Sequence, residues 1–438
     1  MNKMKPYGYK SIFIVALLLL CQPVFAVLSI NIVQGVDKPY PIAIVPFGTG
    51  GIESVIASDL TMSGQFAVMP TSQLPQQPHS ASAVQWSSWQ AVNHDLEFIV
   101  VGNVSPGSQP GTYHVMYQLV SMLGHRSLMG KQFSNIPSSQ LRSLAHFISD
   151  QIYQTITGVR GIFSTRLAYV DVSNPVASKP VFRLMIADAD GHNPRMLLQQ
   201  VDNPIASPIW SPDGKQLAYV SYLHNRMTIY AITLATGQRQ VIASYQGINS
   251  APDWSPDGNT MAMALSKGDG SQTNLYLMNI RTRQLTQLTN FATNTSPRFS
   301  PDGKQLVFTS DRSGQPQIYQ MDLASHQVTR LTFQGLKNFS ADYTPDGKTI
   351  VFMYQASGDS SICLAALNIA TGQMSVLTNG TLDKSPSIAP NGQMVVYANY
   401  DGANGSLAET SINGKIHLQL PEAQGSVQSP AWSPFLTQ

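Results

Sequence analysis

Short apolar runs recur at a steady spacing from residue 165 to the end of the chain. Trp210–Gly214 reads Trp-Ser-Pro-Asp-Gly and leads into the apolar run Leu217–Val220, and close copies of this turn and run return along the chain. The prolines of the turns, spaced 44 or 45 residues apart, are Pro212, Pro256, Pro301, Pro345, Pro390 and Pro434. A period this constant indicates a repeat architecture.

Each period has the composition of four short strands. After the turn and its apolar run comes a second run such as Ile229–Tyr230, then a turn such as Ala235–Gly237, then a last run such as Gln284–Thr289. Proline presets the backbone of the Pro-Asp-Gly turn, aspartate bonds its own backbone, and glycine accepts the positive φ that follows. Four strands in about 40–45 residues is the size of one propeller blade.

The two ends of the repeat region are complementary parts of one blade. Thr165–Asp171 matches the run after a turn but has no turn before it, and Ser429–Pro434 matches the segment before a turn. The last strand therefore supplies the missing inner strand of the first blade, which leaves no open sheet edge. The prediction is an all-β six-bladed β-propeller over residues 165–438, closed by the C-terminal strand.

Residues 27–160 lack this period and predict a separate α/β domain. The longer of its two expected helices takes Ser138 or Ser139 as N-cap and ends at Gly158. The expected elements are strands at Ser29–Val33, Ile42–Phe47, Phe98–Gly102 and Tyr113–Val120, and helices at Ile52–Leu60 and Ser139–Thr157.

The first 26 residues predict a signal peptide that is cleaved after Ala26. Three lysines precede an apolar stretch at 12–20, and Pro23 and Ala26 follow it. A membrane-spanning helix needs about 20 apolar residues, so this stretch is too short to insert the protein in a bilayer. We therefore expect an exported protein without direct membrane insertion.

Charge and cysteine content narrow the class of function. Removing the three leader lysines from 26 basic residues leaves 23 against 24 acidic ones, so the mature chain is near neutral. It has no basic stripe of the kind that holds nucleic acid. Cys363 is the single cysteine after cleavage, so no intramolecular disulfide is expected.

The sequence favours a protein without catalytic chemistry. The aspartates of the turns recur in blade after blade, whereas an active site is made once, so we interpret them as turn residues. The nine histidines show no metal-ligand spacing, and neither a Gly-x-Ser-x-Gly nor a Gly-x-x-x-x-Gly-Lys motif occurs. No cofactor or metal is predicted. A propeller-capped peptidase is the enzyme alternative, but residues 27–160 lack the nucleophile motif that it needs.

Strand order predicts which propeller face binds partners. In an antiparallel four-stranded blade, the turns after strands one and three lie on one face, and the connections after strands two and four lie on the other. The first face carries the short Pro-Asp-Gly and Ala-Thr-Gly turns. The second carries longer, varied loops such as Gln246–Ser250 and Phe291–Thr295 around the channel mouth. Varied loops on a rigid scaffold are the usual place for binding.

The order of leader, α/β domain and six blades ending in Pro430–Pro434 resembles the TolB family of the Tol-Pal cell-envelope system. Gln34–Asp37 followed by Pro41–Phe47 is similar to the N-terminal signature of that family, and Ser385–Gly392 is similar to its fifth turn. The resemblance covers the mature chain. It implies a periplasmic monomer.

The resemblance also implies two partners. The lipoprotein Pal would bind the loop face of the propeller, and the family's contacts fall on or beside Asn249, Ala251, Asn294, Thr295 and Asn338. Colicins would use the same surface. The family pattern has His and Gly where this chain has Ile248 and Ser250, so no polar contact is expected from the side chain at 248.

The second implied partner is the C-terminal domain of the inner-membrane protein TolA. It would bind a mobile segment at 27–38, because a short extended segment can add a strand to a sheet edge. The residues implied for this contact are Val27, Leu28, Ile30, Ile32, Val36 and Asp37.

The predicted function is therefore an adaptor that joins Pal to TolA and supports outer-membrane integrity and envelope constriction at cell division. In this hypothesis the N-terminal segment either packs on the protein or is released to TolA, and Pal biases the choice. The alternative is a propeller that binds a small ligand or glycan in its channel, which would require aromatic or clustered charged residues at the channel mouth.

Overall fold

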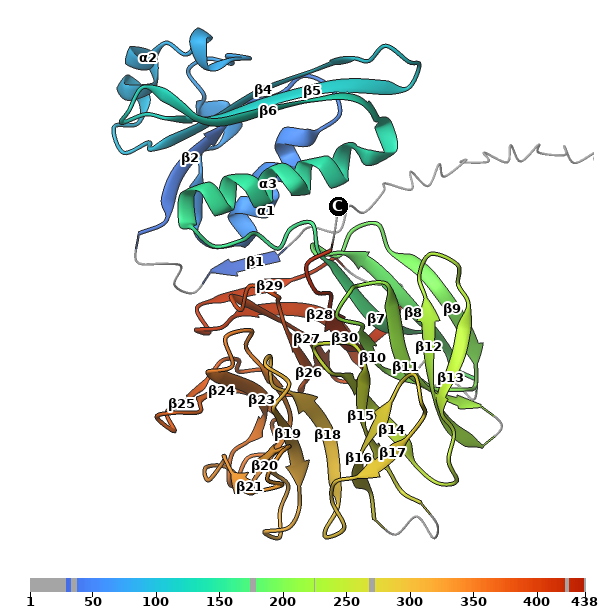
Figure 1. The fold of residues 1–438 in the computed structure, drawn as a ribbon. Helices are drawn as coiled ribbons and strands as arrows, with labels where there is room; N and C mark the ends of the chain where they lie inside the picture. Colours follow the sequence, from blue (N-terminus) through green and yellow to red (C-terminus); the bar gives the residue numbers. More distant parts are fainter. Residues whose placement is uncertain are drawn as a thin grey trace, which may run out of the picture.

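The computed structural model describes residues 29–32, 38–173, 179–223, 225–267, 272–421 and 425–436. Within these residues an N-terminal α/β domain stands on one face of a six-bladed β-propeller (Figure 1). The predicted fold class is confirmed. The predicted signal peptide with Ala26, as well as Val27, Leu28, Val36 and Asp37, lies outside the described residues.

The N-terminal domain is built on a five-stranded mixed sheet with the order β3-β2-β4-β5-β6. Strand β2 runs parallel to β3 and β4, and β4, β5 and β6 form an antiparallel meander. The strands are β2 (Tyr40–Ile44), β3 (Phe66–Val68), β4 (Phe98–Pro106), β5 (Thr112–Ser121) and β6 (Arg126–Pro137). The helices are α1 (Ile52–Met62), α2 (Trp86–Val92) and α3 (Leu141–Thr157), with short 3-10 turns η1 (Thr71–Gln73), η2 (Ala81–Ala83) and η3 (Ser138–Gln140).

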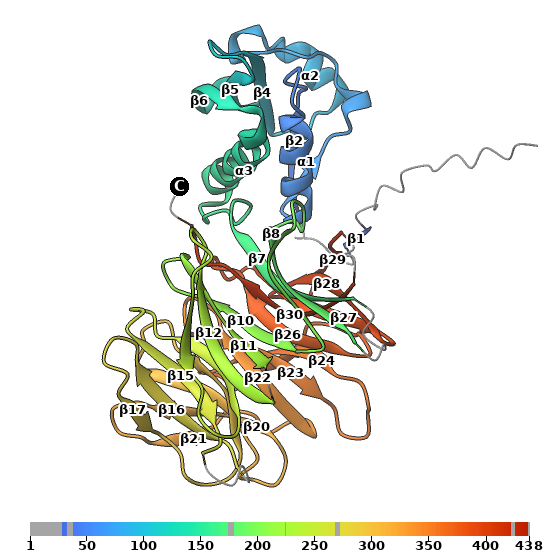
Figure 2. The ribbon, with the colours of Figure 1, turned by 90° about the vertical axis from the view of Figure 1, so that its right-hand side faces the viewer.

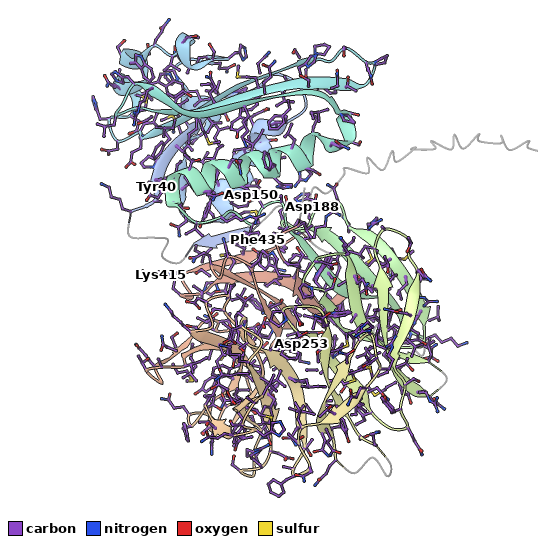
Figure 3. All side chains as sticks on the ribbon, in the orientation of Figure 1. Tyr40, Asp150, Asp188, Asp253, Lys415 and Phe435 are labelled. Carbon is purple, nitrogen blue, oxygen red and sulfur yellow. The ribbon has the colours of Figure 1, made fainter. Side chains whose placement is uncertain are left out.

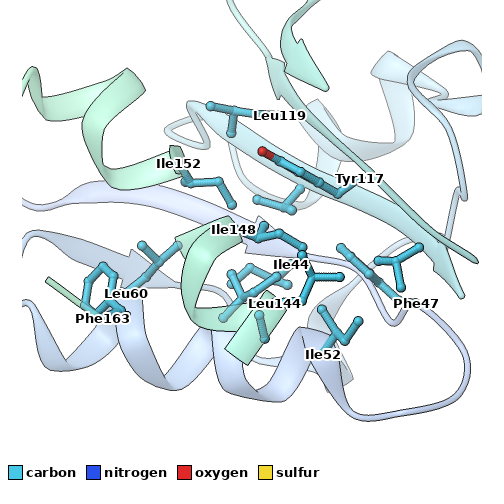
Figure 4. Packing of buried hydrophobic residues seen from close by; sticks show 14 of the residues in the cluster. Ile44, Phe47, Ile52, Leu60, Tyr117, Leu119, Leu144, Ile148, Ile152 and Phe163 are labelled. Atoms are coloured by element: carbon cyan, nitrogen blue, oxygen red, sulfur yellow. The ribbon is translucent and has the colours of Figure 1, made fainter. Parts of the chain in front are cut away.

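Helices cover both faces of this sheet. On the face toward the propeller, α1 and α3 pack their apolar side chains against Ile44 and Tyr117 of the strands (Figure 4). On the other face, Trp89 of α2 is fully buried against Val101 and its neighbours. The strands β3 and β6 and the helix α2 have no counterpart in the sequence prediction, since none of them shows a clean apolar period.

The predicted N-cap of α3 is wrong. The helix begins at Leu141, and Gln140 occupies the cap position without a side-chain hydrogen bond. Ser138 and Ser139 instead lie in the 3-10 turn η3, which directly follows β6, so neither serine has the extended backbone of a capping residue. The predicted end is confirmed, because Gly158 is left-handed with φ 77°.

Each of the six blades has an inner strand and three further strands, as predicted. A Pro-Asp-Gly turn follows the inner strand in blades 2 to 5, and Pro390-Asn391-Gly392 takes its place in blade 6. In blade 1 the inner strand comes from the C-terminal end of the chain. Blade 1 contains β30 (Ser426–Trp432), β7 (Arg166–Ser173), β8 (Val181–Asp188) and β9 (Arg195–Val201). Blade 2 contains β10 (Ile205–Trp210), β11 (Gln216–Leu223), β12 (Arg226–Thr233) and β13 (Arg239–Ala243), and blade 3 contains β14 (Asn249–Trp254), β15 (Thr260–Leu265), β16 (Asn274–Asn279) and β17 (Leu285–Gln287). Blade 4 contains β18 (Asn294–Phe299), β19 (Gln305–Ser310), β20 (Gln317–Asp322) and β21 (Val328–Arg330), and blade 5 contains β22 (Lys337–Tyr343), β23 (Thr349–Gln355), β24 (Cys363–Asn368) and β25 (Met374–Val376). Blade 6 contains β26 (Asp383–Ile388), β27 (Met394–Asp401), β28 (Asn404–Ser411) and β29 (Ile416–Gln419).

The C-terminal strand closes the ring as predicted. Strand β30 pairs antiparallel with β7, and Trp432 at its end is 5 % exposed. The indole Nε1 of Trp432 donates to the hydroxyl of Thr165 at 2.8 Å, and its backbone N–H donates to Ser387 of the neighbouring blade at 3.0 Å. One residue therefore ties the two ends of the propeller and two adjacent blades together.

The N-terminal domain stands on the turn face of blades 1 and 6 (Figure 2). Met62 of α1 belongs to one apolar cluster with Met394 and Ile416 of blade 6. In the segment between the domains, the carbonyl of Arg160 accepts a hydrogen bond from the side chain of Asn391 at 3.0 Å. The guanidinium of Arg160 lies 3.9 Å from the ring centroid of Phe435.

Replacement of Trp432 by alanine should lower the free energy of unfolding by about 3–5 kcal/mol, because it opens a cavity and removes a buried donor at the closure. Urea unfolding of the mature chain measures the loss. Val376→Ala, at an outer-strand position that is 52 % exposed, is the matched control and should stay within about 0.5 kcal/mol of the parent. Equal losses in the two variants would contradict the assigned closure.

Candidate functional site

The Pro-Asp-Gly turns use their carboxylates to hold the backbone. Asp213 accepts from the hydroxyl of Ser211 at 2.6 Å and from the backbone N–H of Lys215 at 3.0 Å. Asp257, Asp302 and Asp346 make the same pair of contacts in their own turns. The interpretation of these aspartates as turn residues is confirmed. The propeller face that carries these turns is covered by the N-terminal domain over blades 1 and 6.

The opposite face of the propeller surrounds a channel mouth. Each inner strand carries one irregularity, where a residue other than glycine takes a φ between 47° and 55°, and the next residue resumes the strand. The six residues are Ser207, Ala251, Ser296, Ser340, Ser385 and Ser429. They line one central cavity of about 80 Å³. A non-glycine residue in the left-handed region destabilises the folded state by on the order of 1–3 kcal/mol. Six such residues around one cavity therefore suggest that the shape of the channel mouth serves a function.

Three charged residues follow these kinks along the inner strands, and together they are called the charged ring: Asp253, Arg298 and Asp342. Arg298 donates to the carboxylate of Asp253 at 3.4 Å and to the backbone carbonyl of Pro252 at 3.2 Å. The Asp253 carboxylate also accepts the backbone N–H of Phe299 in the next blade at 2.7 Å, and Asp342 accepts that of Ile388 in the same way at 3.2 Å. These side chains therefore link blade 3 to blade 4 and blade 5 to blade 6; Figure 3 labels Asp253 within the propeller.

The sequence prediction did not single out this charged ring, although a signal was present. Asp253, Arg298 and Asp342 each directly precede the aromatic residue of their turn, and alignment of the repeats in register would have placed them in one layer. Burial raises the pKa of Asp253 to about 7 against the opposing effect of the Arg298 charge, and burial likewise raises the pKa of Asp342.

Three of the five residues implied for the loop-face partner have buried side chains. Asn249, Asn294 and Asn338 are each 0 % exposed. Asn249 accepts from the backbone N–H of Tyr245 at 2.9 Å and donates back to the carbonyl of Tyr245 at 2.7 Å. Asn294 and Asn338 donate to carbonyls of their own loops in the same manner. In this structure these amides fold the loops, and they do not face solvent.

The other two implied residues lie at the surface of the channel mouth. Ala251 is one of the six kink residues and lines the central cavity. Thr295 precedes the kink residue Ser296 and is partly exposed. Two exposed aromatic residues on neighbouring loops were missed, Phe291 at 67 % and Phe333 at 73 % exposure, because apolar residues in a polar loop carry no periodic signal.

A second candidate element lies on the outer edge of blade 6. Strand β1 (Ser29–Ile32) pairs antiparallel with β29, with Ser29 opposite Gln419 and Ile32 opposite Ile416. It thereby adds a fifth strand to that sheet, as Figure 1 shows between the two domains. The sequence predicts this segment as part of the α/β domain, whereas its backbone pairs with a strand of the propeller. Of the residues implied for TolA, Ile30 and Ile32 lie in β1.

Both domains match family models. Residues 28–128 match the model described as the TolB amino-terminal domain, and residues 153–436 match the one described as the TolB beta propeller domain. This chain belongs to the TolB family. Its relatives in Bordetella and Francisella are named Tol-Pal system proteins, as the resemblance in sequence led us to expect.

Whole-chain relatives agree with the TolB assignment. The Tol-Pal system protein TolB of Bordetella pertussis (strain Tohama I) is 38% identical over 441 residues, covering 99% of this chain and 97% of the relative. That of Francisella tularensis subsp. tularensis (strain FSC 198) is 39% identical over 390 residues, covering 87% of each chain. The crystal structure of TolB from Acinetobacter baumannii is 39% identical, with a TM-score of 0.84 over 93% of this chain and all of that one. Among the described residues of this TolB-family chain, no helix has the length and apolar character needed to cross a membrane.

The charged ring predicts a pH dependence of stability. The pKa of Asp253 is raised from 3.8 to about 7 in the folded chain, so the folded state holds a proton that the unfolded state releases. Stability is therefore lost as the pH rises from about 4 to 7, by up to about 1.4 kcal/mol per pH unit. Asp253→Asn should flatten this part of the curve, and urea unfolding at several pH values measures it.

Asp257→Asn is the control for this variant, because it makes the same substitution in the same blade at an exposed turn. Hydrogen bonds from Ser255 and Asn259 lower the pKa of Asp257, so its stabilising contribution is lost on acidification, which is the opposite sign. An Asp253→Asn curve parallel to that of the parent between pH 4 and 7 would contradict the assignment.

Proposed function

We propose that this chain is a non-enzymatic periplasmic adaptor of the Tol-Pal system, which binds Pal through the propeller loop face and the C-terminal domain of TolA through its N-terminal segment. Membership of the TolB family supports the Tol-Pal part of this proposal. The partners, the periplasmic location after cleavage at Ala26, the monomeric state and the role in outer-membrane integrity and cell division belong to the proposal. Colicins would compete with Pal for the loop face.

The observation that carries the proposal is the separation of two elements, the channel mouth and strand β1, on one closed propeller. The kinked channel mouth lies on the loop face, away from the N-terminal domain, which stands on the turn face. Strand β1 lies at the outer edge of blade 6, where an antiparallel backbone ladder to β29 joins it to the sheet. One rigid body can therefore present two surfaces at the same time, as an adaptor requires.

The channel mouth suits a protein partner that inserts a side chain. Five kink residues are serines, whose hydroxyls can donate and accept, and Arg298 lies beneath them in the same cavity. The exposed rings of Phe291 and Phe333 lie on the loops that lead into neighbouring blades, and aromatic residues are enriched among the anchors of protein interfaces. Pal would therefore contact the mouth at Ala251 and Thr295 and the loops at these rings.

Strand β1 suits the second partner through backbone pairing. An edge strand can leave its sheet and pair with another one, since the hydrogen bonds that it gives up are replaced by equivalent bonds in the partner. The implied contact residues Ile30 and Ile32 are within this strand. The switch hypothesis follows: β1 is either paired with β29 or released to TolA, and Pal on the propeller changes the balance between these two states.

Deletion of the N-terminal segment should abolish TolA binding and leave Pal binding intact. The test is titration calorimetry of mature protein (27–438) and of a chain that begins at Lys38 against purified Pal and the TolA C-terminal domain. Loss of both interactions in the shorter chain would contradict two separate surfaces. Binding of neither partner to the intact chain would contradict the proposed function itself.

Ala251→Arg should produce the converse result, since a long side chain at the channel mouth would occupy the cavity that the partner enters. We expect Pal affinity to fall at least tenfold and TolA affinity to be unchanged in the same calorimetric assay. Ala235→Arg is the matched control, because Ala235 is exposed in a turn of the opposite face. Equal effects of the two arginines on Pal would contradict binding at the loop face.

A further inference from the structure

A cluster of ionisable side chains lies at the junction between the two domains. His146 of α3 is 2 % exposed, and its Nδ1 lies 2.9 Å from a carboxylate oxygen of Asp59 in α1, which is also 2 % exposed. The other ring nitrogen, Nε2, faces the carboxylates of the turn between β8 and β9. It lies 3.8 Å from Asp190 and 4.0 Å from Asp188. Figure 3 labels Asp188 at this junction.

The ring nitrogen Nε2 has no hydrogen-bond partner among the described residues, although it is buried. An unsatisfied buried polar atom is unfavourable, so its position between two carboxylates calls for an explanation. The Nδ1 contact with Asp59 is the arrangement by which proteins orient a histidine whose other nitrogen binds a metal ion. One oxygen each from Asp59 and Asp190 and one nitrogen of His146 lie within 4.8 Å of one another.

The junction between the domains contains a further buried carboxyl group. Glu409 of β28 is 4 % exposed, and one of its carboxylate oxygens has no partner in the described part of the chain. It lines a cavity of about 60 Å³ together with Asp59 and Asp190.

We propose that this junction binds a divalent transition metal of the zinc class through Nε2 of His146 and one oxygen each of Asp188 and Asp190, with Asp59 orienting the imidazole. Zinc bonds to nitrogen and oxygen are about 2.0–2.2 Å long, so tetrahedral donors lie about 3.4 Å apart. The distances from Nε2 of His146 to the carboxylates of Asp190 and Asp188, 3.8 and 4.0 Å, exceed this separation by only a few tenths of an ångström. The metal would join α3 directly to blade 1 and fix the two domains together.

Arg142 is the competitor for this site. Its Nη2 contacts the carboxylate of Asp190, and its Nε lies 3.7 Å from that of Asp188. The Arg142 side chain is 29 % exposed, so its guanidinium can move toward solvent when a metal ion takes its place.

The test is titration calorimetry of zinc chloride into untagged mature protein at pH 7.5, together with thermal unfolding. The parent should bind one zinc ion per chain with a rise in melting temperature. Arg142→Ala should bind at least tenfold more tightly, since the competing cation is gone, and His146→Gln should lose at least tenfold in affinity. His94→Gln, at an exposed loop position, should bind as the parent does.

Two results would overturn the proposal: zinc bound equally by His146→Gln, or no zinc bound by either the parent or Arg142→Ala. Should His146→Gln fail to fold, the visible spectrum of Arg142→Ala with cobalt(II) bound tests whether the site exists. Histidine and carboxylate ligation predicts a visible absorption band that one equivalent of zinc removes, and a spectrum identical to that of aqueous cobalt would exclude the site.

Discussion

The pairing of β30 with β7 is the constraint on which the rest of this structure depends. It joins residues 426–432 to residues 167–172, completes the four-stranded sheet of blade 1 and thereby closes the ring of six blades. Because the ring is closed, the loops at the channel mouth keep their relative positions, and the strained kinks of the inner strands are held in place. A rigid mouth reduces the entropy that a partner must remove on binding.

Side chains of the inner strands stabilise the propeller further, because they form hydrogen bonds with the backbone of the next blade. Asp253 binds the backbone of Phe299, Asp342 binds that of Ile388, and Ser387 binds that of Trp432. These contacts place carboxylates in a buried layer, where burial raises the pKa of Asp253 to about 7. The same residues that fasten the blades thus make the propeller sensitive to pH.

The sequence was sufficient for features that depend on local chemistry. The turn residues, the 44-residue period and the split blade follow from short segments, and each is present in the structure. It was insufficient where distant segments meet. The cluster of Asp59, His146 and Asp190 joins two helices of one domain to a turn of the other, and no spacing along the chain reports it. Likewise, Asn249 stands in a polar loop, yet its amide is buried because it bonds the loop's own backbone.

The least predictable feature is the pairing of β1 with β29, nearly the whole chain length away, and the proposed coupling between the two partner surfaces depends on it. Hydrogen–deuterium exchange of residues 29–32 and 416–419, with and without saturating Pal, tests the central claim that the two surfaces are coupled. The account predicts that Pal changes amide protection in both strands together, since they share one ladder. Unchanged protection in both strands at full Pal occupancy would contradict it.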